Sequence, residues 1–246
     1  MPGTAHLEQS EFDICCEWGL HGVQVLAPIS DVVVIVDVLS FTTCVDIATA
    51  NGAVVFPCRF RDDAASDFAR TRNALLAGPR GAGSGTWSLS PASLLDIPAD
   101  VRLVLPSPNG STLSLATGAT PTLAGCLRNS RAVAAYAGRL GRRVAVIACG
   151  ERWPDGSLRP AVEDLIGAGA IISYLAGSKS PEALAAEAVF AAGRTDLHGV
   201  VAACGSGQEL IRRGFRTDVE QATRLDCSGS VPLLRGESYV DMNATC

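Results

Sequence analysis

Residues 32–36 are VVVIV, and Asp37 follows them directly. Five consecutive β-branched apolar residues are typical of a strand buried on both faces, as in parallel sheets that are covered by helices. A polar turn at residues 40–43 (SFTT) comes next, and the apolar positions after it favour a helix. The segment therefore predicts a buried strand, a turn and a helix, which together form the first part of a βαβ unit.

The same alternation continues along the chain. Further strands are predicted at residues 53–58, 102–106, 120–127, 143–148 and near Val231. Helices are predicted at residues 61–77, 131–140, 181–193, 197–213 and 218–225, and from about residues 112 and 160. We therefore expect an α/β fold with a largely parallel or mixed sheet and helices on both faces, in three layers (α/β/α).

Length and composition favour one large core. A chain of 246 residues is expected to form a single domain over 1–246, or two intimately packed halves of about 1–127 and 128–246. Hydrophobic residues make up 48% of the chain and aromatic residues only 5%, which suits a core of aliphatic side chains. The glycine-rich segment 78–90 is expected to form an irregular loop over a site.

Composition also disfavours several classes of protein. The net charge is −5 and the sequence has no run of Lys or Arg, so nucleic acid is not an expected partner. Three histidines without metal-site spacing give little material for a zinc centre, and an odd number of cysteines, nine, favours reduced thiols and a cytoplasmic location. The polar N-terminus is unlike a signal peptide, and the apolar stretch 165–177 is too short to span a membrane.

Polar residues follow several of the predicted strands. Ligands of such sheets bind at the carboxyl ends of the strands. The residues expected to approach one another there are Asp37, Asn109, Asn129 and Glu151. An unpaired carboxylate at Asp37 would be costly to bury, which favours a bound cation. Capping of the helix that begins near Phe41 is the alternative.

Other residues at these loops are suited to bind anions or a metal. Ser40, Thr42 and Thr43, and the loop Asn109-Gly110-Ser111, offer hydroxyls and amides to phosphate oxygens, although capping and turn formation explain them equally well. Arg152 is suited to clamp a phosphate or sulfonate, or to pair with Asp155. Acidic residues 163 and 164 lie in the first turn of a helix, where the macrodipole also favours them.

Five segments together resemble one known family: residues 34–43 (VIVDVLSFTT), 108–111 (PNGS), 128–130 (RNS), 149–151 (CGE) and 161–169 (AVEDLIGAG). They are similar to segments of the 2-phosphosulfolactate phosphatase (ComB) family, whose first two segments are hydrophobic-Asp-Val-x-Arg-Ala-Thr-Thr and Thr-Asn-Gly-Thr. The resemblance extends over nearly the whole chain from about residue 25.

The resemblance implies hydrolysis of a small acidic phosphate monoester, typically 2-phosphosulfolactate to sulfolactate and phosphate, with Mg²⁺ as the cofactor and a place in coenzyme M biosynthesis. The implied metal ligands are Asp37, Glu151, Glu163 and Asp164. The implied catalytic groups are Asp37, Glu151 and Arg152. The implied substrate ligands are Ser40, Thr42, Thr43, Arg80, Asn109, Gly110, Ser111 and Asn129.

The chain also departs from the family pattern. Ser40 stands where members usually carry Arg, and residues 78–82 (GPRGA) and 89–91 (LSP) lack a Glu and an Asn, although Arg80 is expected to retain one function. These losses leave a non-catalytic anion-binding homologue as an alternative. A Cys149-dependent hydrolase is another, but no base is near in sequence, which favours a buried, inert thiol. A homodimer is the commonest expectation for a soluble enzyme.

Overall fold

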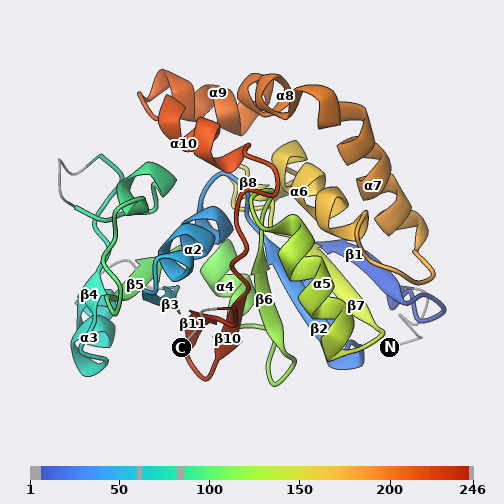
Figure 1. Cartoon of the computed structure of the whole chain (residues 1–246), viewed down its shortest axis with the longest axis horizontal. Helices are drawn as coiled ribbons and strands as arrows, with labels where there is room; N and C mark the ends of the chain where they lie inside the picture. Colours follow the sequence, from blue (N-terminus) through green and yellow to red (C-terminus); the bar gives the residue numbers. More distant parts are fainter. Residues whose placement is uncertain (1–6, 60–62, 82–85, 244–246) are drawn as a thin grey trace.

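The computed structural model describes residues 7–59, 63–81 and 86–243. Within these ranges the main sheet has nine strands in the order β1-β7-β2-β6-β10-β11-β3-β5-β4 (Figure 1). These strands are β1 Ile14–Trp18, β2 Val32–Val36, β3 Val54–Cys58, β4 Leu75–Leu76, β5 Arg102–Pro106, β6 Thr122–Gly125, β7 Val144–Ala148, β10 Pro232–Arg235 and β11 Ser238–Asp241. A separate hairpin pairs β8 Glu151–Arg152 with β9 Leu158–Arg159. The predicted α/β fold with a mixed sheet is therefore confirmed.

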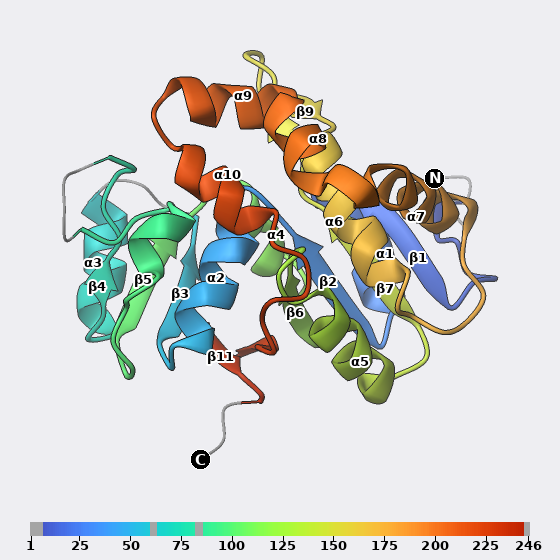
Figure 2. The ribbon, with the colours of Figure 1, turned by 45° about the horizontal axis from the view of Figure 1, so that its top comes forward.

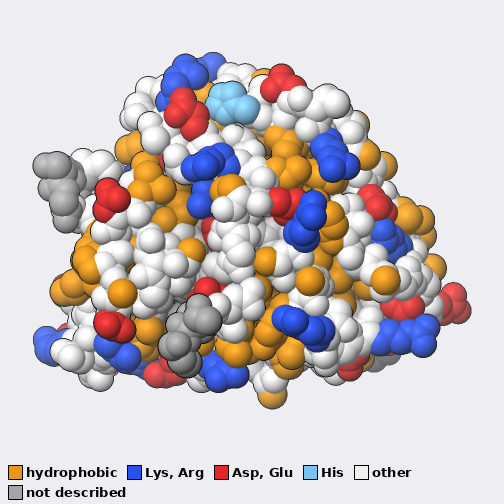
Figure 3. Space-filling model, viewed as in Figure 1, with side chains coloured by type: hydrophobic (Ala, Val, Ile, Leu, Met, Phe, Trp, Pro, Cys, Tyr) orange, Lys and Arg blue, Asp and Glu red, His pale blue; other side chains and the backbone are white. Residues whose placement is uncertain are grey.

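Helices cover both faces of the sheet (Figures 1 and 2). They are α1 Gly19–Leu26, α2 Phe41–Ala50, α3 Asp63–Thr71, α4 Gly110–Ser114, α5 Ser130–Leu140, α6 Val162–Ile172, α7 Pro181–Gly193, α8 Leu197–Ala203, α9 Gly205–Arg212 and α10 Arg216–Ala222. The last three, α8 to α10, form an arc along the top of the molecule in Figure 1. On the face shown in Figure 3, acidic, basic and apolar side chains are interspersed.

Strand β2 lies inside the sheet, between β7 and β6, and runs parallel to both. All five of its side chains are fully buried. Val32, Val34 and Val36 pack with residues of α5 and α6, whereas Val33 and Ile35 pack on the other face with α1 and α4. Burial on both faces explains the unbroken apolar run, since each such side chain contributes about 1.5–3 kcal/mol when it leaves water.

Strands from the two halves of the chain are interleaved in this sheet. β7 lies between β1 and β2, and the β10–β11 hairpin lies between β6 and β3. This hairpin meets each neighbouring strand at one register pair, Leu233 with Leu123 and Tyr239 with Val55. The hairpin thus joins the parallel block β1-β7-β2-β6 to the parallel block β3-β5-β4.

Some elements differ from those predicted. The region predicted as one helix at 197–213 contains two, because Cys204 has an extended backbone (ψ 164°) that ends α8. The helix predicted at 61–77 ends at Thr71 and is followed by β4, and its predicted start at residues 61 and 62 lies outside the described residues. The same holds for residues 82–85 of the predicted loop 78–90 and for residues 1–6. No helix in the described ranges has both the length and the apolar character to span a bilayer.

The packing of α6 against α7 yields a stability prediction. A Cβ added at Gly169 would lie 2.0 Å from the carbonyl oxygen of Ala186, so Gly169→Ala is expected to destabilise the fold by about 1–3 kcal/mol. Gly138 in α5 has no atom within 4 Å of its added Cβ, so Gly138→Ala should raise stability by up to about 1 kcal/mol. Urea unfolding of both variants measures this, and equal effects would contradict the close packing of the two helices.

Candidate active site

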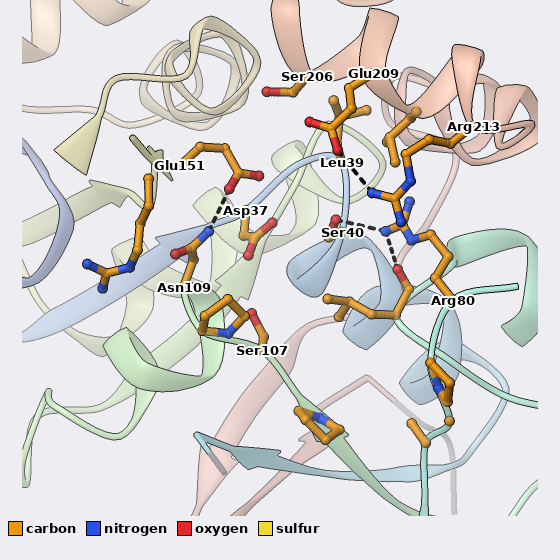
Figure 4. Close-up of a pocket in the computed structure, with 18 of the residues that line it drawn as sticks. Asp37, Leu39, Ser40, Arg80, Ser107, Asn109, Glu151, Ser206, Glu209 and Arg213 are labelled. Carbon is orange, nitrogen blue, oxygen red and sulfur yellow. Dashed lines mark hydrogen bonds and ion pairs between the residues drawn. The ribbon is translucent and has the colours of Figure 1, made fainter. Parts of the chain in front are cut away.

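A cavity of about 760 Å³ lies where the loops after β2, β5 and β7 meet (Figure 4). The β8–β9 hairpin, helix α9 and residues 76–80 form its other walls. Its volume falls within the range of about 300–1,000 Å³ that is common for small-molecule sites. In Figure 4, Asp37, Asn109 and Glu151 lie together on one side, and Arg80, Glu209 and Arg213 lie on the other. The cavity therefore has the carboxylates of Asp37 and Glu151 on one side and, on the other, two guanidinium groups together with the carboxylate of Glu209.

Asp37 is only 7% exposed and lies directly after β2. Its carboxylate accepts hydrogen bonds from the backbone amides of Phe41 and Gly110, each at 3.2 Å. Burial and then repulsion from Glu151 raise the pKa of Asp37 to about 7, although the two amides and Arg80 act in the opposite direction. Asp37 thus caps α2, as one sequence interpretation held, and also faces the cavity as a carboxylate that is costly to ionise.

Gly110 allows the loop after β5 to reach Asp37. A Cβ on this residue would lie 2.3 Å from a ring carbon of Phe41, so any side chain would push the two loops apart. The same loop carries Asn109, whose side-chain amide donates to Glu151 Oε2 at 3.0 Å. Because Asn109 donates through nitrogen, its amide oxygen remains available as a ligand. Asp37, Asn109 and Glu151 are therefore brought together at one edge.

Glu151 lies at the start of β8 and lines the cavity. Burial raises the pKa of its carboxyl group, and nearby Glu163 adds to this, whereas the Asn109 hydrogen bond and the charge of Arg159 lower the pKa. Two carboxylates thus face one partly buried space, and each destabilises the charge of the other. Such a pair is stabilised by a cation.

Asp164 does not line the cavity, but it binds the backbone of two loops that do. One carboxylate oxygen accepts from the amide of Val38 and the other from the amide of Gly150, each at 2.8 Å. It thereby joins the loop after β2 to the loop that carries Glu151. Burial and repulsion from Asp37 raise its pKa well above the usual range. Glu163, also buried, accepts from the thiol of Cys204 at 3.3 Å.

Three of the predicted phosphate-binding hydroxyls are buried and bond to the backbone instead. Thr42 Oγ1 donates to the carbonyl of Asp37, Thr43 Oγ1 to that of Val38 and Ser111 Oγ to that of Leu105. These three residues do not line the cavity. Their hydroxyls fix the shape of the turns that present Asp37 and Asn109.

Asn129 does not join the group at the sheet edge, contrary to expectation. It is fully buried, and its side-chain oxygen accepts from the amide of Cys126 at 2.9 Å. Its side-chain nitrogen donates to the carbonyls of Ala124 and Ser230 at 3.3 Å. The side chain thus closes the turn after β6 and does not line the cavity, because the turn itself has backbone groups to satisfy.

Arg80 reaches the cavity from the first residues of the glycine-rich segment 78–90. It donates to Asp218 at 3.0 Å, to Ser40 Oγ at 2.9 Å and to the carbonyl of Leu89. Asp218 is 1% exposed and also accepts from Ser90 Oγ at 2.6 Å. A guanidinium therefore lies beside residue 40, although the chain has serine at that position.

The cavity residues that were not anticipated from the sequence include Arg159, Ser206, Glu209 and Arg213. Arg159 belongs to β9, whereas the other three belong to α9 or to the residue directly after it. All four come later in the sequence than the strand ends at which the site was predicted. Arg152, which was anticipated, also lines the cavity, but it is exposed and donates to the carbonyl of Gly156 at 2.9 Å, not to Asp155. Local sequence around 205–213 carries no signal for the site beyond its charged residues.

Cys149 lies behind the cavity wall. It is 3% exposed, and burial together with the charges of Asp37 and Asp164 raises the pKa of its thiol well above the usual range. Neither histidine in the described ranges, His21 or His198, lines the cavity. These facts disfavour Cys149 as a nucleophile, because catalysis would require its thiolate and a base.

Within the described ranges, no group of three or more His, Cys, Asp or Glu side chains is arranged as a metal site. Neither Glu163 nor Asp164 lines the cavity. On the wall that carries Asp37, the oxygen donors that line the cavity include the carboxylates of Asp37 and Glu151 and the amide oxygen of Asn109. Oxygen donors of this kind fit a hard cation such as Mg²⁺, which commonly takes one or two carboxylates together with water and substrate.

Comparison with known proteins adds an independent finding. The model of the 2-phosphosulpholactate phosphatase family matches residues 23–237, a range that includes all the cavity residues. A protein of Carboxydothermus hydrogenoformans named "Probable 2-phosphosulfolactate phosphatase" is 32% identical over 211 residues, covering 81% of this chain and 84% of its own. The "2-phosphosulfolactate phosphatase" of Methanothermobacter thermautotrophicus is 29% identical over 208 residues, covering 84% of this chain and 88% of its own.

The raised pKa of Asp37 predicts a pH dependence of stability. A carboxyl group whose pKa is higher when folded holds more protons in the folded state, so its contribution to stability falls as pH rises from about 4 to about 7. In Asp37→Asn the part of the stability decline that is due to Asp37 should disappear, while the parts due to Glu151 and Asp164 remain. Urea unfolding between these pH values measures it in the absence of metal. Parallel curves for both proteins would contradict the raised pKa.

The role of Asp164 predicts a loss of stability in Asp164→Asn. The side-chain NH₂ of asparagine would face one of the two backbone N–H groups, and two donors cannot form a hydrogen bond. We therefore expect the unfolding free energy to fall by about 1–3 kcal/mol. Asp67→Asn, at an exposed ion pair with Arg70, is the matched control and should change stability by less than about 0.5 kcal/mol. If Asp164→Asn is as stable as the control, Asp164 does not join the two loops.

Proposed function

Because the chain belongs to the 2-phosphosulpholactate phosphatase family and is a phosphoric monoester hydrolase, we propose that it hydrolyses 2-phosphosulfolactate to sulfolactate and phosphate in this cavity, with Mg²⁺ as the cofactor. The observation that carries the proposal is the pair of partly or fully buried carboxylates, Asp37 and Glu151, in a cavity that four arginines of the described part of the chain also line. A cation would stabilise the two carboxylates, and an anionic ligand would pair with the arginines.

Asp37, Glu151 and the amide oxygen of Asn109 would hold the Mg²⁺. When bound, the ion offsets negative charge on the phosphate oxygens during transfer. The chain's own residues position these ligands: Asp37 is held by two backbone amides, and Glu151 by Asn109. Preorganised ligands of this kind lower the cost of arranging the site for reaction.

Arg80 supports catalytic competence despite the serine at position 40. Its guanidinium is fixed by Asp218 and donates to Ser40 Oγ, so positive charge is supplied to this wall by another segment. Arg152 on the hairpin adds further positive charge. A dianionic phosphate ester is thus attracted to the cavity although the chain as a whole carries a net charge of −5.

We favour direct attack of water on phosphorus. The segment Asp37-Val38-Leu39 lacks the second aspartate of the Asp-x-Asp signature of phosphatases that form an aspartyl-phosphate. In addition, both carboxylate oxygens of Asp37 already accept backbone amides, which holds the group as a fixed ligand. Phosphorylation of Asp37 would weaken at least one of these bonds, because the ester oxygen of an acyl phosphate is a poorer acceptor than a carboxylate oxygen.

Phosphate release from a panel of monoesters tests the proposal. The panel contains 2-phosphosulfolactate, 2-phospholactate and an uncharged-tail phosphate ester, each assayed with Mg²⁺ or with chelator. We expect turnover that needs Mg²⁺ and prefers 2-phosphosulfolactate. Asp37→Asn should lower kcat/KM by about two orders of magnitude or more.

The exposed Asp67→Asn variant is the control and should retain wild-type turnover. Turnover that is unaffected by chelator would contradict the proposal that Mg²⁺ is the cofactor. A folded protein without turnover of any ester would instead indicate a homologue that binds anions without catalysis.

A further inference from the structure

We infer that Arg159 and Ser206 form the binding site for a second anionic group of the substrate, a carboxylate or sulfonate close to the phosphate. This inference rests on the proposed phosphatase function and adds the residues that determine specificity for acidic esters. The two residues come from different elements: Arg159 ends β9, and Ser206 lies in the first turn of α9. Figure 2 shows these two elements side by side.

Within the described ranges, Arg159 differs from Arg80 and Arg213 because its charge is unpaired, and from Arg152, which is exposed and donates to the carbonyl of Gly156, because it is half-buried. Arg80 is paired with Asp218 at 3.0 Å, and Arg213 with Glu209 at 2.9 Å. Arg159 is half-buried and, among the described residues, forms no ion pair. Its guanidinium donates to Ser206 Oγ at 2.8 Å, and its charge lowers the pKa of Glu151. A half-buried guanidinium without a counter-ion is suited to receive an anion from the ligand.

Ser206 completes the site with a second donor. It is 6% exposed and lines the cavity, and its oxygen accepts from Arg159. Within the described part of the chain, its hydroxyl hydrogen has no acceptor, so it is available to a ligand. The same hydrogen bond holds the guanidinium against α9. Ser206 therefore positions Arg159 and can itself donate to the anion.

The hairpin sets the spacing between the two ends of the substrate. Glu151 and Arg159 are register partners in the antiparallel β8–β9 pair. Partners of this kind have Cα atoms about 4.5–5.5 Å apart, which places the carboxylate wall and the guanidinium next to each other. A ligand that reaches both groups carries its phosphate within a few bonds of its second anion. In 2-phosphosulfolactate the phosphate is on C2, with a carboxylate and a sulfonate on the neighbouring carbons, which meets this requirement.

The test compares Arg159→Gln, Arg159→Lys and Ser206→Ala on two substrates, 2-phosphosulfolactate and a phosphate ester with an uncharged tail. We expect Arg159→Gln to raise KM for 2-phosphosulfolactate by about tenfold or more, because a charge-assisted hydrogen bond is lost. Its kcat/KM for the uncharged-tail ester should change less than about threefold by the same reasoning. Lysine should restore part of the affinity, since it keeps the charge but loses the planar fork.

Ser206→Ala should raise KM for the acidic ester by a smaller factor. The double variant with Arg159→Gln should be less than additive, because Ser206 acts partly through Arg159. Arg212→Gln is the matched control: it lies on α9, is exposed, and bonds to Gln208 outside the cavity. Equal losses on both substrates in Arg159→Gln would overturn the inference.

Calorimetric binding of sulfolactate and of inorganic phosphate separates this inference from the proposed function. Sulfolactate carries the two tail anions without phosphate, so its affinity should fall in Arg159→Gln while that of phosphate stays within about threefold of wild type. Unchanged sulfolactate affinity would overturn the assignment of Arg159. If the wild-type protein binds sulfolactate through Arg159 but hydrolyses no ester, the assignment of this site holds and the proposed function is wrong.

Discussion

The burial of a carboxylate at the end of a fully buried strand is the constraint on which the site depends. The five residues of β2 are buried on both faces, so Asp37, which follows the strand directly, is poorly solvated. Its charge is then opposed by burial and by Glu151. Only fixed donors and positive charge can compensate, and the surrounding loops supply the former through backbone amides.

The architecture around Asp37 follows from the need to hold those donors in place. Gly110 lets the loop after β5 approach Phe41 closely, and Asp164 links the loops that carry Asp37 and Glu151. Buried threonine hydroxyls fix the turn after β2. Each of these polar contacts is internal to the scaffold, and a limited set of polar residues, counted over the described residues, lines the cavity: three carboxylates, one amide, three serines and four arginines. That small set has the chemistry of a cation site beside an anion site.

The sequence was informative where burial alone decides the outcome. The apolar runs at β2, β5 and β7 predicted the strands to within a residue, and strand ends placed Asp37, Asn109 and Glu151 at one edge. It could not tell whether a polar side chain at a loop faces the ligand or its own turn. Asn129 shows this, since its amide satisfies backbone groups that only the folded turn creates.

Long-range packing was also beyond the sequence. Arg159 and Ser206 are 47 residues apart, and neither lies in a motif, so their meeting depends on how α9 packs beside the hairpin. The break between α8 and α9 is equally hidden, because an extended Cys204 interrupts a pattern that is helical on both sides. Such features follow from the packing of whole elements, which local propensity does not determine.

The central claim is that the buried carboxylates require a cation, and Mg²⁺-dependent stability of Glu151→Gln tests it most directly. Glutamine keeps an oxygen that can accept from Asn109 and removes only the charge. At pH 7.5, Mg²⁺ at 100 times its dissociation constant should raise the unfolding free energy of the wild type by about 2.7 kcal/mol. The same Mg²⁺ concentration should raise that of the variant much less. Equal gains in both proteins, or none in the wild type, would contradict the account.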